Sequence, residues 1–184
     1  MTEQQLPSWP TTPPTHGSVA LREFTDDDVH LAIEFGVDPY IPIIGSLPAY
    51  PTAQEALDWV HRQRGRFAEG TGLSFVIADA ESDTALGAIG LWLRSLPAGR
   101  ATVGYSVAPA HRGRGIATSA VTAVTTFAWT IPGLYRVELY VEPWNHGSIH
   151  VAEASGYARE GLLRSYQEIG GTRRDMLLYA TTRP

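Results

Sequence analysis

The sequence predicts an α+β fold, in which one twisted sheet of about seven strands, mixed but mainly antiparallel, is flanked by about four helices. The hydrophobic period predicts this class, because it changes along the chain between two, typical of strands, and about 3.6, typical of helices. The elements follow in the order βααβββαβαββ. The length of 184 residues fits a single domain, and the chain shows neither an internal repeat nor a domain linker.

The first 16 residues are predicted to form a tail outside the fold. Four prolines between residues 7 and 14 exclude a regular helix or a central strand there. We expect a mobile tail over residues 1–16, followed by one domain over residues 17–184. The alternative is that Trp9 pins the tail to a surface of that domain.

Local signals mark the elements in the first part of the domain. Residues 18–24 alternate and predict a strand. Thr25 begins a helix, because its hydroxyl can cap the first turn and the three aspartates after it favour the positive end of the helix dipole. Residues 37–51 hold four prolines and are predicted to be irregular. A capping box at Thr52 begins the second helix, which ends near Gly70.

The middle of the chain predicts three strands in an antiparallel meander. Residues 73–78 alternate with period two, and residues 85–93 are apolar on both faces, as in a covered central strand. A strand over residues 101–107 follows a turn at Pro97 and Gly99. The remaining elements are a helix, a strand, a short helix and a closing hairpin. They cover residues 116–128, 135–141, 146–155, 162–169 and 172–180.

Composition excludes several kinds of chemistry. All 14 basic residues are arginine, and the chain has no cysteine, so Schiff-base chemistry, thiol nucleophiles and cysteine metal sites are ruled out. The net charge of −5 argues against a nucleic-acid or membrane partner. The N-terminus resembles no signal peptide, and no stretch is apolar enough to span a membrane, so we expect a soluble, cytoplasmic protein.

The strongest chemical signal is a glycine-rich turn between a strand that ends at Val107 and a helix that begins after Gly115. The first amides of a helix lack internal partners, and glycine lets a phosphate approach the backbone closely. Arg112 and Arg114 add positive charge at this turn, which favours a polyphosphate over an ordinary tight connection. A Walker loop is excluded because the chain has no lysine.

The turn, Arg112-Gly113-Arg114-Gly115-Ile116-Ala117, resembles the pyrophosphate-binding motif of the GCN5-related N-acetyltransferases (GNAT superfamily). Four further segments resemble the RimJ/RimL-type branch, named for enzymes that acetylate the N-termini of ribosomal proteins. The similarity covers about residues 18–181. The four segments are residues 135–139, 145–148, 156–161 and 174–180.

This resemblance implies that acetyl-CoA is the acyl donor and that an amine is the acceptor. The turn would bind the pyrophosphate, the backbone of the preceding strand would pair with the pantetheine amides, and an asparagine would bind the pantetheine arm. The implied donor-binding residues are Ser106, Val107, Arg112, Gly113, Arg114, Gly115, Ile116, Ala117 and Asn145.

The resemblance also implies that Ser148 protonates the leaving thiolate. Many family members use a tyrosine seven residues after the asparagine for this step, but here that position is Ala152. An amine nucleophile must lose a proton, which needs a carboxylate or a water relay. Glu138 is our first candidate for this base, and Glu142 is the next together with Glu168; a chain of water molecules is a serious rival.

The proline-rich segment and the closing hairpin are expected to build the acceptor site. The expected substrate-binding residues are Tyr40, Ile44, Tyr50 and Trp92. We expect no metal, because His146 and His150 have no evident third ligand. We therefore predict direct acetyl transfer to a primary amine, either a protein N-terminus or a small molecule. A larger donor such as succinyl-CoA, a noncatalytic acyl-CoA-binding module and a homodimer all stay open.

Overall fold

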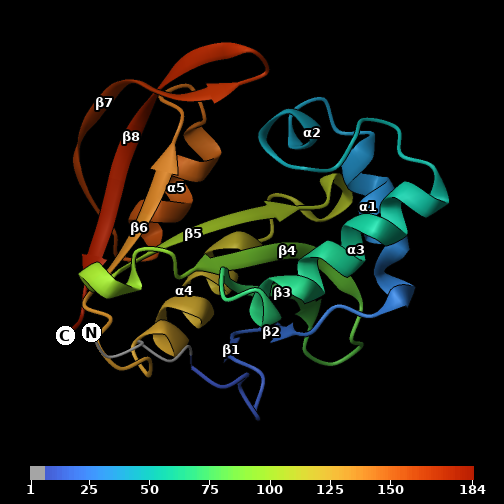
Figure 1. The fold of residues 1–184 in the computed structure, drawn as a ribbon, viewed down its shortest axis with the longest axis horizontal. Helices are drawn as coiled ribbons and strands as arrows, with labels where there is room; N and C mark the ends of the chain where they lie inside the picture. Colours follow the sequence, from blue (N-terminus) through green and yellow to red (C-terminus); the bar gives the residue numbers. More distant parts are fainter. Residues whose placement is uncertain (1–6) are drawn as a thin grey trace.

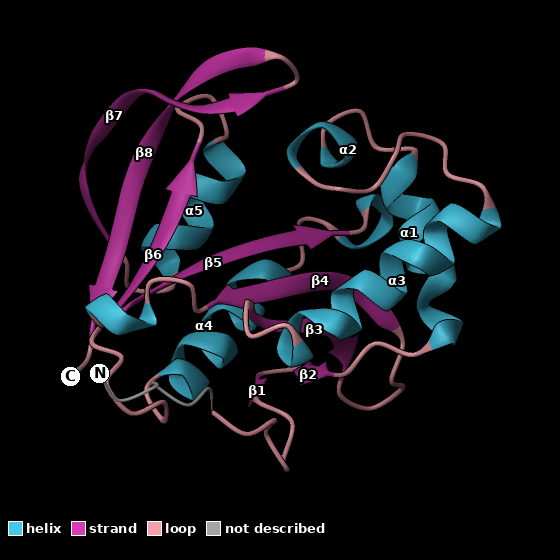
Figure 2. Ribbon diagram, in the orientation of Figure 1, coloured by secondary structure: helices cyan, strands magenta, loops and turns pink. Residues whose placement is uncertain are grey.

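The computed structural model describes residues 7–184 and contains one eight-stranded sheet with helices on both faces (Figures 1 and 2). The predicted α+β class and element order are confirmed, with one strand and one short helix more than expected. The strands are β1 (Thr15–His16), β2 (Val19–Arg22), β3 (Gly72–Asp79), β4 (Ala85–Trp92), β5 (Arg100–Val107), β6 (Arg136–Val141), β7 (Ala158–Ile169) and β8 (Thr172–Thr182). The helices are α1 (Val29–Gly36), α2 (Ile41–Ile44), α3 (Ala53–Ala68), α4 (Ile116–Ala128) and α5 (His146–Ala154).

The sheet has the strand order β1-β2-β3-β4-β5-β6-β8-β7, and β5 with β6 is its parallel pair. This pairing covers three residue pairs, from Arg100 with Arg136 to Thr102 with Glu138. Beyond Thr102 the two strands diverge, as Figure 1 shows. The second half of β5 therefore keeps one backbone edge that β6 does not cover, and this edge faces the divergence.

Two apolar cores lie on opposite faces of the sheet. On β3, Phe75 and Ile77 pack in the core that contains α4, whereas Val76 and Ala78 pack in the core that contains α1 and α3. Each fully buried side chain of this size contributes about 1.5–3 kcal/mol of transfer free energy. Both faces of β4 are also covered, as its continuous apolar sequence predicts.

Capping fixes where two helical segments begin, as the sequence predicts. Thr52 accepts a hydrogen bond from the backbone N–H of Glu55 (3.3 Å), and the Glu55 carboxylate accepts one from the backbone N–H of Thr52 (2.8 Å). Thr25 precedes a 3₁₀ turn, η1 (Asp26–Asp28), which leads into α1. The backbone N–H of Thr25 donates to Asp28 (2.8 Å), and Arg22 binds both oxygens of the same carboxylate at 2.9 Å.

In its described part, the N-terminal segment packs against the domain. The Trp9 ring lies 4.9 Å from that of Phe75 and 5.7 Å from that of Phe67, between ring centroids. Residues 15 and 16 form β1, which pairs with β2. Residues 7–16 therefore correspond to the pinned alternative rather than to a mobile tail, and residues 1–6 lie outside the described part. The domain boundary at residue 17 stays a prediction.

The segment between α1 and α3 lies opposite the closing hairpin across the divergence of β5 and β6 (Figure 1). The hydroxyl of Tyr40 donates to Glu142, just beyond β6, at 2.6 Å. The Tyr40 ring packs edge-on against Trp144, with centroids 5.0 Å apart. A Cβ atom on Gly170, in the hairpin turn, would contact Ile43 of α2 at 3.9 Å. The two diverging parts of the molecule are thus joined by side-chain contacts.

Candidate active site

The glycine-rich turn lies at the N-terminus of α4, where the sequence predicts an anion site. Gly113 and Gly115 have φ angles of 76° and 74°, a left-handed conformation that favours glycine. Cβ atoms built at either position would meet nothing within 4 Å, so the space around the turn is open. Ile116 begins the helix and is buried, whereas Arg114 is exposed and has no described side-chain partner. This turn fits a phosphate group in its shape and its charge.

Arg112 has a different environment from Arg114. Its guanidinium binds the buried carboxylate of Asp38 at 2.7 Å and donates from Nε to the carbonyl oxygen of Val107 at 3.0 Å. Asp38 in turn accepts hydrogen bonds from the backbone N–H groups of Tyr40 and Ile41. Burial tends to raise the pKa of Asp38, but these bonds and Arg112 outweigh it and lower the pKa. Arg112 therefore joins the phosphate turn to the segment after α1.

Asn145 and Ser148 lie at the start of α5, as expected from the asparagine motif. The side-chain oxygen of Asn145 caps the helix, accepting from the backbone N–H of Ser148 at 3.1 Å. The Asn145 side chain also lies beside the Tyr40 hydroxyl, where it opposes the rise of the Tyr40 pKa. Ser106 and Val107 form the end of β5, on the strand that diverges from β6.

Tyr105 is a residue that the sequence analysis did not single out. Its buried hydroxyl has no hydrogen-bond partner among the described residues. Burial raises the pKa of Tyr105, and the nearby Ser148 side chain opposes that rise. A buried hydroxyl without a partner is costly in a folded protein, and this one lies beside the Ser148 side chain.

Of the three candidate bases, Glu168 is exposed on β7, whereas Glu138 and Glu142 are buried and contact other side chains. Glu138 accepts from Arg136 Nε at 2.6 Å and from the Tyr140 hydroxyl at 2.8 Å. Glu142 accepts from Tyr40, and Arg174 Nε lies 3.8 Å from its other oxygen. Burial raises the pKa of Tyr40, and Glu142 raises it further, so this phenol stays protonated at neutral pH.

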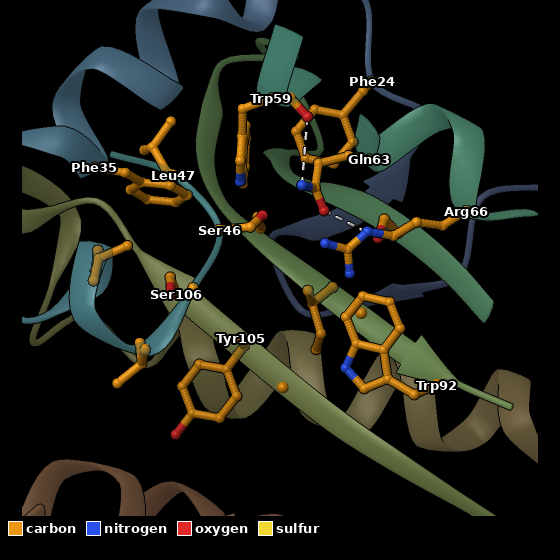
Figure 3. Close-up of a pocket in the computed structure, with 18 residues that line it drawn as sticks. Phe24, Phe35, Ser46, Leu47, Trp59, Gln63, Arg66, Trp92, Tyr105 and Ser106 are labelled. Atoms are coloured by element: carbon orange, nitrogen blue, oxygen red, sulfur yellow. Dashed lines mark hydrogen bonds between the residues drawn. The ribbon is translucent and has the colours of Figure 1, made fainter. Parts of the chain in front are cut away.

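A cleft of about 220 Å³ lies between α3, the α2 segment and strands β3, β4 and β5 (Figure 3). Of the four expected substrate-binding residues, Ile44 and Trp92 line it. Tyr40 instead bridges to Glu142, and Tyr50 is 78% exposed and does not line the cleft. The polar and aromatic part of the lining comprises Phe24, Phe35, Ser46, Trp59, Gln63, Arg66, Ser74, Trp92, Tyr105 and Ser106.

The contribution of α3 to this cleft was absent from the sequence-based prediction. Trp59, Gln63 and Arg66 follow one another at helical spacing, so all three lie on one face of α3. Gln63 is buried and accepts from the Ser74 hydroxyl at 3.3 Å. A buried glutamine within an inward-facing stripe was a signal available in the sequence, because such a stripe is ordinarily apolar.

Comparison with known proteins decides the family. The family model described as the acetyltransferase (GNAT) domain matches residues 18–158. The chain belongs to the GNAT acetyltransferases. The GNAT chain is 27% identical over 162 residues to the N-acetyltransferase p20 of Bacillus licheniformis, a protein described as uncharacterized; the match covers 88% of this chain and 91% of p20.

Solved structures of other GNAT enzymes have the same fold. The structure of Mycobacterium smegmatis RimJ with CoA-disulfide superposes with a TM-score of 0.84 at 28% identity, covering 97% of this chain and 90% of RimJ. The microcin C7 self-immunity acetyltransferase MccE, solved with acetyl-CoA and AMP, gives a TM-score of 0.80 at 15% identity. The superposition covers 95% of this chain and 98% of the MccE chain. The predicted enzyme class, a GNAT-type acyltransferase, is thereby confirmed, as is the resemblance to RimJ.

Two further observations concern the described residues alone. Within residues 7–184, no group of three or more histidine, cysteine or acidic side chains could hold a metal ion. No helix in this range is long and apolar enough to cross a membrane.

Proposed function

We propose that this protein transfers the acetyl group of acetyl-CoA directly to a primary amine, within a ternary complex. The amine belongs to a protein N-terminus or to a small molecule. The observation that carries the proposal is the divergence of β5 from β6 beside the open glycine turn of α4. This arrangement offers backbone donors and acceptors to an extended amide chain, and next to them a cradle for its phosphates.

The donor would be held by three parts of this chain. We assign the pyrophosphate to the turn from Gly113 to Ala117, with Arg114 adding charge, and the pantetheine amides to the backbone of Ser106 and Val107. Asn145 would donate from its amide nitrogen, which carries two hydrogens, to the pantetheine arm. Bound in this way, acetyl-CoA supplies the activated acetyl thioester. We assign Arg112 to hold the neighbouring segment through Asp38.

Proton movement would use residues on both sides of the divergence. We assign Ser148 as the donor to the leaving sulfur, with the Tyr105 hydroxyl beside it as a second donor. For removal of the amine proton, we favour Glu142, at the open end of β6, over Glu138, whose oxygens are engaged by Arg136 and Tyr140. None of the acidic residues between 7 and 184 lines the cleft itself, so water would connect the amine to this base.

The test is binding of acetyl-CoA to Arg114→Ala, measured by titration calorimetry, with release of CoA from an amine panel as the activity readout. We expect the variant to bind acetyl-CoA about tenfold more weakly, because it loses a charge-assisted phosphate contact. Arg94→Ala is the matched control, since Arg94 is also exposed but lies outside the turn. Unchanged affinity in Arg114→Ala would contradict the assignment of the turn, and no CoA release with any amine would contradict the proposed transfer.

A further inference from the structure

The acceptor cleft contains an arginine that lacks an acidic partner. Arg66 projects from α3, is half-buried, and places its guanidinium 4.3 Å above the centroid of the Trp92 ring (Figure 3). No carboxylate among residues 7–184 lies within ion-pair distance of it. Glu69 is close enough to oppose the lowering of the Arg66 pKa by burial, but its carboxylate lies against Gly65. The charge of Arg66 is therefore available to a ligand.

Three other arginines near functional elements are already paired with carboxylates, whereas Arg114, in the glycine turn, does not line the cleft. Arg112 binds Asp38, Arg136 binds Glu138 and Glu160, and Arg174 approaches Glu142. The other polar side chains in the cleft, such as Gln63 and Ser74, are uncharged and bond to each other. Arg66 is thus the charged member of a lining that is otherwise apolar or neutral, which gives the cleft a net attraction for an anion.

The floor under Arg66 is built to hold it in place. Gly90 and Gly104 face each other on β4 and β5, and the Trp92 indole lies over both of them. A Cβ atom on Gly90 would come within 2.6 Å of the indole, and one on Gly104 within 3.6 Å. The two glycines therefore make room for the ring, and the ring supports the guanidinium by a cation–π contact.

We propose, building on the transferase function above, that the acceptor carries a carboxylate and that Arg66 binds it while the amine lies near Ser106. Gly104, beneath the indole, is two residues from Ser106 along β5, a rise of about 7 Å. An extended dipeptide spans about 7 Å from its amine to its carboxylate. The same chemistry could come from a small amino acid compound with a free carboxylate, or from an acidic side chain next to a protein N-terminus.

Paired acceptors test this assignment in the presence of acetyl-CoA. One pair is Ala-Ala and its C-terminal amide, and the other is Ala-Glu-Ala amide and Ala-Gln-Ala amide. We expect the wild-type protein to prefer the charged member of one pair by about tenfold or more in kcat/KM, because a hydrogen-bonded charge pair is lost with the neutral member. Preference within the first pair indicates a small acid, and preference within the second indicates a protein N-terminus.

Variants then link the preference to Arg66. Arg66→Gln should lose the preference for the charged acceptor, mainly through a higher KM for that acceptor. Arg66→Lys should keep part of the preference, and Arg64→Gln should keep all of it. Arg64 lies on the same helix but is bound to Asp26 on the exposed side. Equal use of both members by the wild type, or full preference in Arg66→Gln, would overturn the inference. A selective loss of succinyl-CoA use in Arg66→Gln with an amide acceptor would also overturn it, since Arg66 would then bind the donor.

A binding measurement separates this inference from the proposed function. Ala-Ala and Ala-Glu-Ala amide, each with its neutral partner, are titrated calorimetrically into protein saturated with CoA, without turnover. If a charged peptide binds more tightly and Arg66→Gln removes the difference while no transfer occurs, the inference stands and the transferase proposal fails. If none of these peptides binds and none is acetylated, the inference about Arg66 is overturned.

Discussion

Tyr105 and Ser148 form a pair of hydroxyl groups at the base of the divergence between β5 and β6. The Tyr105 hydroxyl gives up hydration without gaining a partner, so it contributes nothing favourable to folding. Ser148, the donor that we propose for the leaving sulfur, lies next to it, and we expect the two hydroxyls to act together in that step.

This arrangement predicts that stability and activity separate in two variants. Ser148→Ala should lower kcat about 100-fold with little change in the affinity for acetyl-CoA, because a proton donor acts in the transition state. Tyr105→Phe should not lower the free energy of unfolding and should raise it by up to about 1–3 kcal/mol, since it removes a buried hydroxyl that has no hydrogen-bond partner among the described residues. Urea unfolding measures the free energy of unfolding of each variant, and the rate of CoA release measures kcat.

Ser155→Ala is the control for the serine variant, since Ser155 ends the same helix and its hydroxyl contacts only a backbone carbonyl. Full activity in Ser148→Ala would contradict the assigned role. At this scale the sequence predicted the short helix that follows Asn145, because its signals are local, whereas the roles of Asn145 and Ser148 stay predictions. Tyr105 escaped notice because a tyrosine in a strand is ordinary, and only the structure reveals that its hydroxyl is unpaired.

At the scale of elements, the junction between β2 and α1 depends on one buried carboxylate. Asp28 closes the η1 turn by accepting from Thr25 and holds the end of β2 through Arg22. Burial tends to raise the pKa of Asp28, but the hydrogen bonds from Arg22 and Thr25 outweigh it, so the pKa is lowered. The carboxylate therefore stabilises the folded state in its ionised form.

Asp28→Asn should lower the free energy of unfolding at pH 7 by about 3 kcal/mol, because it leaves Arg22 without its buried partner. The pKa of Asp28 is lower in the folded state than its unfolded value of about 3.9, so this stabilisation is complete above that value and is lost as pH falls through the folded pKa. The difference between wild type and variant should thus be constant from about pH 6 to 8 and shrink below about pH 4.

Denaturant unfolding across this pH range measures the effect, with the exposed neighbour Asp27→Asn as the control. A difference that does not change down to pH 3 would rule out the ionised carboxylate as its source. Elements with such local signals were predictable, as the helix start at Thr25 and the capping box at Thr52 illustrate. The short β1 and α2 were not, because β1 exists only through pairing with β2 and α2 is one turn containing Pro42.

At the scale of the whole molecule, Tyr40 connects two parts that the sheet allows to separate. Its hydroxyl reaches across the divergence to Glu142, and its ring contacts Trp144. The two residues joined by this hydrogen bond, Tyr40 and Glu142, are separated by 102 positions in the sequence. No local pattern in the sequence indicates such a partner, which is why Tyr40 was expected in the acceptor site instead.

Tyr40→Phe should lower the free energy of unfolding by about 1–3 kcal/mol, since the buried Glu142 carboxylate loses a short hydrogen bond. Tyr50→Phe, in the same segment, is the matched control and should change it by less than about 0.5 kcal/mol, because Tyr50 is exposed and its hydroxyl has no described partner. Chemical denaturation compares the two. Equal stability of both variants would show that the bridge contributes nothing to holding the halves together.

The acceptor cleft also belongs to this scale, and it marks the limit of what the sequence could predict. The glycine turn lies within eleven residues of continuous sequence, so its role could be inferred from composition and order alone. The cleft combines α3, the α2 segment and three strands, and its floor depends on two glycines that meet only after the sheet has formed. The position of Arg66 in the cleft, over the Trp92 ring, follows only from this tertiary arrangement.

The ion pair between Arg112 and Asp38 has a consequence for how the protein responds to its solvent. The carboxylate is buried, but the guanidinium is 49% exposed, so dissolved ions reach one side of the contact. At about 0.15 M salt, charges are screened over roughly 8 Å, and at 1 M over roughly 3 Å. The ion pair therefore holds the segment after α1, which lines the cleft, less firmly at high salt. The position of this segment, and with it the shape of the cleft, should depend on ionic strength.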